Sequence, residues 1–214
     1  MKIIISHNIY NTVEPLKHTI EIEKSIFPKA EIYVSSNGVK NIDIKNVNFR
    51  FHIKNLGWAL GAFNTMIDSI KFATESTEGD ILLFSHDDVE ICNSNKVLYL
   101  INKIYSGEYD VVVRSHEGDY YMEGHPYYMI ESVLFNFKKA KEIFKSIPII
   151  FNLPISYTKR TGPNGTPCLE MKFAELIKDL KILELPFKEN VREETDMGFI
   201  NIWSVPGNGG KERY

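Results

Sequence analysis

Two adjacent carboxylates, Asp87 and Asp88, follow shortly after a run of four apolar residues, Ile81 to Phe84. Such a run predicts a strand that is buried on both faces of a sheet. Open α/β sheets bind their ligands at the carboxyl ends of strands. Paired acids at that position suit Mg²⁺ or Mn²⁺, which share their coordination with a substrate phosphate. The alternative is a solvated turn in which both side chains serve only as local caps.

Composition limits the class of protein. The chain has 214 residues, enough for one large domain or two small ones with a substantial core. Hydrophobic residues make up 43% and charged residues 25%, as in soluble globular proteins. The formal net charge of -3 argues against a nucleic-acid partner held by bulk electrostatics.

The cysteines and the amino terminus bear on location. Cys92 and Cys168 do not form a C-x-x-C motif, so zinc and redox motifs are unsupported, and two free thiols fit a reducing compartment. The apolar run within residues 1–5 is too short for a signal peptide or a membrane span. We therefore expect a cytoplasmic protein without a membrane span.

Strand and helix patterns alternate through the first half of the chain. The pattern predicts strands at 2–6, 30–35, 48–53, 81–84 and 110–114, with helices at 13–27, 59–75 and 94–106. Asn11 and Thr12 are candidate caps for the first helix. This alternation predicts a mostly parallel sheet with right-handed crossovers.

The order changes after residue 115. We expect an aromatic loop at 116–128, a strand at 132–137, a short helix at 140–147 and a long loop at 151–167. A helix that begins at 166–167 and strands at 182–185 and 198–203 complete the chain. Tyr120, Tyr121, Tyr127 and Tyr128 of the aromatic loop are candidates for packing against sugar faces.

Five segments, in this order, carry a resemblance to a known family. They are His7-Asn8 and Ser36-Asn37-Gly38 at the ends of two predicted strands, then NLGWALGAFN, FSHDDVEI and LEMKFAELIKDLKILELPF. This order resembles that of the GT-A nucleotide-sugar glycosyltransferases, particularly the inverting family 2 type. The likeness covers about residues 2–187 and rests on the order and spacing of the motifs.

The resemblance implies an α/β, GT-A (Rossmann-like) fold with a mostly parallel central sheet flanked by helices. One antiparallel strand is expected after the acid pair. Residues 1–214 would form a single domain. Its nucleotide-sugar-binding half would cover about 1–115 and its acceptor-binding half about 116–205, with a flexible tail at 206–214.

For the metal site, the resemblance matches Asp88 to the last aspartate of the family's DxD motif and Asp87 to its middle position. His86 replaces the first aspartate. A neutral imidazole there can hydrogen-bond a ribose hydroxyl or ligate Mn²⁺ more readily than Mg²⁺. The family's late histidine ligand has no counterpart, because all six histidines lie at or before His125.

The remaining site residues follow from the same resemblance. Glu170 matches the catalytic base of inverting members, and glycines such as Gly61 would let the backbone approach the nucleotide. The expected nucleotide-sugar contacts are His7, Asn8, Ser36, Asn37, Asn55, Gly57, Asn64, His86 and Asp87.

The expected function is metal-dependent transfer of a sugar, with inversion, from a nucleotide-sugar to a carbohydrate or other hydroxyl acceptor. A uridine diphosphate (UDP) sugar is the expected donor. One alternative is a sugar nucleotidyltransferase, although the residues after the first strand, His7 to Tyr10, contain no glycine or arginine. The other is a catalytically silent nucleotide-sugar-binding module, which the histidine at position 86 favours.

Overall fold

The structure is a computed structural model that describes residues 1–9, 13–51, 58–115, 128–148, 169–186 and 194–201. The elements up to residue 105 are β1 (Ile3–Ile9), α1 (Glu14–Ile26), β2 (Glu31–Ser36), β3 (Asn48–Phe51), α2 (Trp58–Ser76), β4 (Ile81–His86), β5 (Val89–Ile91) and α3 (Ser94–Tyr105). Those that follow are β6 (Val111–Ser115), β7 (Tyr128–Asn136), α4 (Phe137–Lys145), α6 (Leu169–Ile177), β8 (Ile182–Pro186) and β9 (Phe199–Asn201).

Seven strands form the central sheet, in the order β3-β2-β1-β4-β7-β6-β8. β7 runs antiparallel to both of its neighbours, β4 and β6. The other neighbouring pairs, β2 with β3, β1 with β2, β1 with β4, and β6 with β8, are parallel. The predicted α/β fold with a mostly parallel sheet and one antiparallel strand after the acid pair is confirmed.

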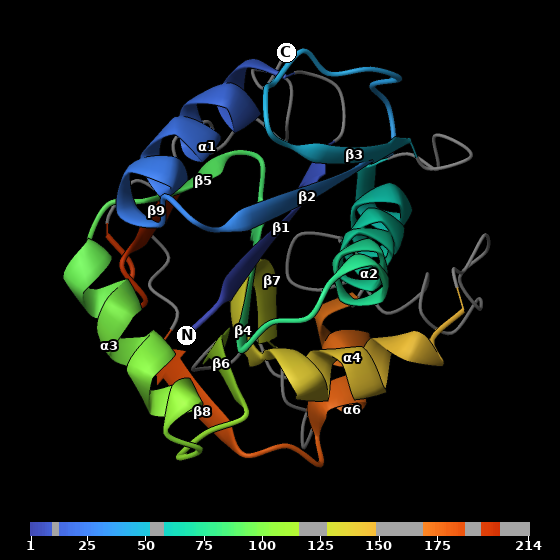
Figure 1. The fold of residues 1–214 in the computed structure, drawn as a ribbon. Coiled ribbons are helices and arrows are strands. Elements are labelled where there is room, and N and C mark those ends of the chain that lie inside the picture. Colours follow the sequence, from blue (N-terminus) through green and yellow to red (C-terminus); the bar gives the residue numbers. More distant parts are fainter. Residues whose placement is uncertain (10–12, 52–57, 116–127, 149–168, 187–193, 202–214) are drawn as a thin grey trace.

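Helices cover both faces of the sheet (Figure 1). α1 and α3 lie on one side, and α2, α4 and α6 lie on the other. Each side has its own apolar core, and β4 contributes to both. Leu82 and Phe84 pack under α2, whereas Ile81 and Leu83 pack under α1 and α3. This two-sided burial is why residues 81–84 are continuously apolar, as predicted.

A second, two-stranded sheet joins β5 to β9, which pair antiparallel. The carbonyl of Gly198 accepts hydrogen bonds from the backbone amides of Cys92 and Asn93, both at 3.0 Å. Val89 is the register partner of Asn201. A segment late in the chain therefore holds the residues that come directly after the acid pair. The sequence pattern did not predict β5, because three residues are too few to show a period.

Helix caps agree only partly with the sequence pattern. The N-cap of α1 is Val13, which makes no side-chain capping bond, and the predicted caps at 11 and 12 lie outside the described residues. Asn93 and Asn136 cap α3 and α4 by accepting from the amides of Lys96 and Lys139. None of the helices within the described ranges is long and apolar enough to span a membrane.

A pair of glycine substitutions tests how much the β5–β9 contact contributes to stability. Gly198 and Gly107 both have left-handed backbone angles, with φ of 83° and 79°. Alanine at either position should therefore carry strain of about 1–2 kcal/mol. A Cβ at 198 would also lie 2.6 Å from the backbone oxygen of Asn93, whereas a Cβ at 107 meets nothing within 4 Å.

We expect Gly198→Ala to lower the free energy of unfolding by about 1–3 kcal/mol more than Gly107→Ala does, because of this additional overpacking. Urea unfolding of both variants and the parent measures the difference. Equal losses would mean that the close approach of the two segments contributes nothing.

Candidate functional site

The carboxyl edge of the sheet collects the ends of β1, β2, β4, β6 and β8, because these strands run in the same direction. Four of the described helices also begin at this edge. α1, α2, α3 and α6 each lead into a strand of that direction, so each helix runs back from the carboxyl edge. Ligands of open α/β sheets bind at this edge.

The acid pair occupies the two-residue turn between β4 and β5 at this edge. Asp87 is 8% exposed and Asp88 is 4% exposed, so the carboxylates are buried rather than solvated. The turn is also held from α1, where the Thr19 hydroxyl donates to the carbonyl of Asp87 at 3.2 Å. Burial of two adjacent carboxylates is costly unless cationic or hydrogen-bonding groups compensate their charge. A cation bound at the turn would supply such compensation.

A polar row crosses the sheet next to this turn, on the face covered by α2. Arg50 of β3 is the register partner of Ser35, Ser35 of Asn8, and Asn8 of His86. The Asn8 amide also donates to the carbonyl of Ala62 in α2, at 3.1 Å. Side chains from four separate strands thus meet at the predicted site.

His86 ends both β4 and the polar row. It is half-buried, and its ring stands edge-on to Phe84, with the centroids 5.9 Å apart. Since Phe84 belongs to the core under α2, His86 lies on the same side of the sheet as that helix. It therefore adjoins the acid pair from the α2 side.

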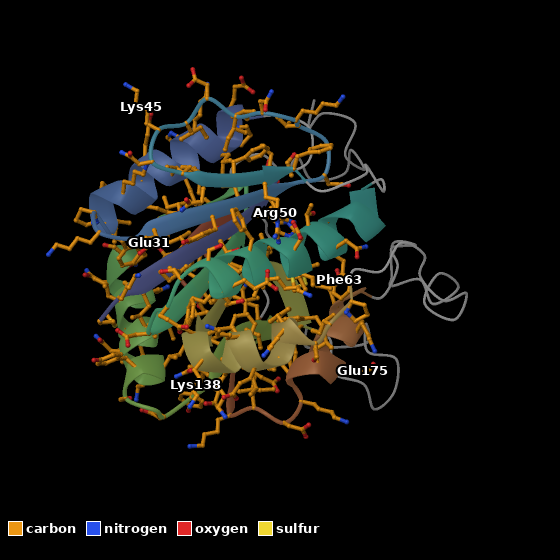
Figure 2. The ribbon with its side chains drawn as sticks, turned by 45° about the vertical axis from the view of Figure 1, so that its right-hand side comes forward. Glu31, Lys45, Arg50, Phe63, Lys138 and Glu175 are labelled. Atoms are coloured by element: carbon orange, nitrogen blue, oxygen red, sulfur yellow. The ribbon has the colours of Figure 1, made fainter. Side chains whose placement is uncertain are left out.

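Arg50 and Asp68 form a charge pair that the sequence pattern did not predict. Arg50 Nη2 lies 2.7 Å from Asp68 Oδ1, and the Ser35 hydroxyl donates to Asp68 Oδ2 at 2.6 Å. The guanidinium also lies 4.7 Å from the centre of the Phe72 ring, between β3 and α2 (Figure 2). Asp68 brings a carboxylate to the end of β2, where the sequence has only Ser35, Ser36 and Asn37. The sequence indicates this carboxylate only through the position of Asp68, an acidic residue within an apolar helical pattern, four residues after Asn64.

The turn after β2 packs against the start of α2. The hydroxyl of Ser36 accepts from the amide of Val39 at 2.8 Å, and the amide of Asn37 donates to the carbonyl of Ile9. A Cβ on Gly61 would overlap the side-chain nitrogen of Asn37. A glycine is therefore needed at position 61 to make room for the side chain of Asn37, whereas the sequence predicts that Gly61 makes room for the nucleotide.

His7 lies on the opposite face from Asn8. It is fully buried; its Nε2 is 2.8 Å from Oε2 of Glu23, and its Nδ1 is 3.2 Å from both the carbonyl and the hydroxyl of Ser85. The ring is thus placed inside the core between β1, β4 and α1. This geometry favours a structural role for His7 rather than the expected contact with the nucleotide.

Glu170 is the second residue of α6, so it lies at the helix end that faces the carboxyl edge. It is half-buried, and α6 packs against α2 and β7. Glu170 and His86 therefore share one side of the sheet. Asn64 is fully buried in α2.

Several predicted residues cannot be placed or have another role. Asn55, Gly57 and three of the four tyrosines lie outside the described residues. Tyr128 belongs to β7, is buried, and donates its hydroxyl to Oε1 of Glu184 at 2.7 Å. That hydroxyl therefore links two strands of the sheet, β7 and β8, in this structure.

The residues present fit a magnesium-like ion only with help from a ligand. Within the described ranges, no group of three or more His, Cys, Asp or Glu side chains is arranged to hold a metal ion. Asp87 and Asp88 supply two carboxylates. Mg²⁺ commonly takes one or two from a protein and completes its octahedron with phosphate oxygens and water. This donor set is compatible with such an ion.

Comparison with known proteins identifies the fold. No protein-family model and no curated protein sequence matches the chain. The bifunctional IspDF from Campylobacter jejuni is similar in structure, with a TM-score of 0.56 and 14% identity over 91% of this chain and 52% of that one. S. aureus TarS has a TM-score of 0.50 and 13% identity over 88% of this chain and 36% of that one.

The chain thus spans about half of the IspDF chain and a smaller part of TarS. A 4-diphosphocytidyl-2C-methyl-D-erythritol synthase from Anaerococcus prevotii has a TM-score of 0.47 and 11% identity, over 92% of this chain and 95% of that one. At these identities the likeness concerns the fold alone. The chain has the GT-A-like α/β fold seen in the first two proteins.

Proposed function

We propose that the protein is a metal-dependent glycosyltransferase that moves a sugar from a UDP-sugar to an acceptor hydroxyl, with inversion. One observation carries this proposal: the burial of Asp87 and Asp88 in a turn at the carboxyl end of the central strand β4. A cation held there would act as a Lewis acid that neutralises the departing diphosphate. The choice of UDP and of inversion rests on the resemblance in sequence.

The polar row next to the acid pair supports a nucleotide site. His86, which is half-buried at the end of the row, would hydrogen-bond the ribose, whereas Asn8 and Ser35 are buried in register beside it and bond to α2. Asp68 is already engaged by Arg50, which leaves the row close to neutral. In this proposal the charge of the donor is met at Asp87 and Asp88, through the cation, and its nucleoside is met by the row.

Glu170 is the proposed base. Its place at the start of α6 puts it at the same edge of the sheet as the acid pair, although α6 comes from the second half of the chain. A single displacement with inversion needs a base on the face of the sugar opposite the leaving group. Glu170 would take the proton of the acceptor hydroxyl, while the surrounding side chains limit access of water.

The first prediction concerns Asp88. We expect Asp88→Asn to lower Mn²⁺-dependent hydrolysis of a UDP-sugar by about 100-fold or more, because a neutral amide is a poor ligand for a hard cation. Release of UDP measures the rate. Asp179→Asn is the matched control, since Asp179 is exposed in the turn before β8, at the other edge of the sheet, and should leave the rate unchanged.

The second prediction concerns Glu170. We expect Glu170→Gln to reduce the rate of transfer to an acceptor by about 10²–10⁴-fold, the usual contribution of a general base. Affinity for UDP with Mn²⁺, measured by calorimetry, should stay within a factor of two. Glu175→Gln, an exposed position on the same helix, serves as control. An equal fall in both variants would remove Glu170 from the proposed chemistry.

Product analysis separates the proposal from its two alternatives. A glycosyltransferase releases UDP from a UDP-sugar, whereas a nucleotidyltransferase releases pyrophosphate from a nucleoside triphosphate and a sugar phosphate. We expect release of UDP with Mn²⁺ and no pyrophosphate from UTP or CTP. Release of pyrophosphate would favour the nucleotidyltransferase. Binding of UDP-sugar that raises the melting temperature without any metal-dependent turnover would favour the silent binding module.

A further inference from the structure

A buried chain of polar groups links three elements beneath the acid pair. Glu23 of α1 contacts Nε2 of His7 on β1 at 2.8 Å, and Nδ1 of His7 lies 3.2 Å from the carbonyl and the hydroxyl of Ser85 on β4. All three residues are fully buried. Although the order serine, histidine, carboxylate is that of a hydrolase triad, no substrate can reach these side chains. We therefore consider a structural role for these three residues.

These hydrogen-bonded side chains lie within an apolar core. Ile5 and Ile9 flank His7 on β1, Leu83 precedes Ser85 by two residues, and all three belong to the cluster under α1 and α3. Replacement of buried ionisable pairs by well-packed apolar residues is often neutral or stabilising. Gain in stability therefore does not by itself account for the pair. Hydrogen bonds are directional, so the pair can set the position of β4 relative to α1.

His7 can bond Ser85 in either protonation state. An ionised Glu23 only accepts, so Nε2 of His7 carries the proton between them. When His7 is neutral, Nδ1 accepts from the hydroxyl of Ser85. When it is charged, Nδ1 donates to the carbonyl of the same residue. The link from α1 to β4 is kept in both cases.

A second contact from the same face of α1 reaches the turn itself. Thr19 lies four residues before Glu23, on the same side of the helix, and is also fully buried. Its hydroxyl donates to the carbonyl of Asp87 at 3.2 Å. A third contact joins the largely exposed imidazole of His18 to Glu90, and an ion pair with one exposed member contributes little. α1 thus contacts the polypeptide within and after the acid pair, and is linked through His7 to Ser85 before it.

We propose that Thr19 and Glu23 are positioning residues, which hold the turn between β4 and β5 in the conformation that presents Asp87 and Asp88 to a cation. The effect on cation binding rests on the function proposed above, but the effect on the turn does not. Neither residue touches the donor. Glu23 acts through His7 and Ser85, and Thr19 acts through the backbone of Asp87.

Hydrogen–deuterium exchange tests the effect on the turn directly. In Thr19→Val, we expect the amides of residues 86–91 to exchange about tenfold faster, because loss of one buried hydrogen bond lowers the local opening free energy. In Glu23→Gln we expect a smaller increase, because the amide oxygen still accepts from Nε2 of His7 but the bond is no longer charge-assisted. Thr19→Ser keeps the hydroxyl and should restore the parent rate. Thr74→Val is the matched control, since this buried threonine bonds a carbonyl of its own helix, α2, and should leave the turn unchanged.

Calorimetry of UDP with Mn²⁺ on the same variants measures the consequence. We expect Thr19→Val and Glu23→Gln to weaken binding by a factor similar to the change in exchange, and Thr19→Ser and Thr74→Val to match the parent. If exchange at 86–91 does not change, or if it rises equally in every segment, the positioning role is wrong. If the parent does not bind UDP with Mn²⁺, the proposed function fails, while the exchange data still decide whether α1 holds the turn. Should Glu23→Gln fail to fold, Thr19→Val and its serine rescue decide alone.

Discussion

Pairing of β4 between β1 and β7 is the constraint on which the rest of the structure depends. Its apolar residues pack into both cores, so the strand cannot slide by one residue without moving every side chain to the wrong face. The register with β1 places Asn8 beside His86 and His7 beside Ser85. One strand pairing therefore fixes the positions of two polar groups, Asn8 with His86 on one face and His7 with Ser85 on the other. Asp87 and Asp88 come directly after the last residue of β4, so this pairing also sets the position of the turn.

The two faces have different roles in the proposal. Under α2, the row that runs from Ser35 through Asn8 to His86 would meet the nucleoside of the donor at His86. Under α1, Glu23 and His7 are fully buried and would support the turn from the opposite face of the sheet. Such a division lets one face change with the ligand while the other keeps the geometry of the acidic turn.

Sequence reasoning predicted the fold well because its signals are local and long. The apolar run of β4, the period of α2 and the alternation of elements each extend over enough residues to be clear. β5 has three residues and no such signal. The pair Arg50–Asp68 joins a strand to a helix eighteen positions away in the chain, and only the packing of the two elements brings them together. The metal, the donor and the base remain predictions.

The position of His7 inside the core has a clear physical cause. Adjacent residues of a strand point to opposite faces, so His7 and Asn8 cannot both line the same crevice. The motif placed the dipeptide at the correct edge of the sheet. Of the two residues, Asn8 lies on the side that α2 covers, and the side that a helix covers is a property of the whole fold.

The order of the strands has a consequence for synthesis of the protein on the ribosome. β7 lies between β4 and β6, although it follows both in the chain, and β9 pairs with β5. While the first 115 residues emerge, β4 lacks one of its two neighbours and β6 lacks both. The acidic turn receives its last support only when residue 201 has left the exit tunnel. A nascent chain would therefore carry β1 to β6 for some time before the turn that holds Asp87 and Asp88 is fully supported.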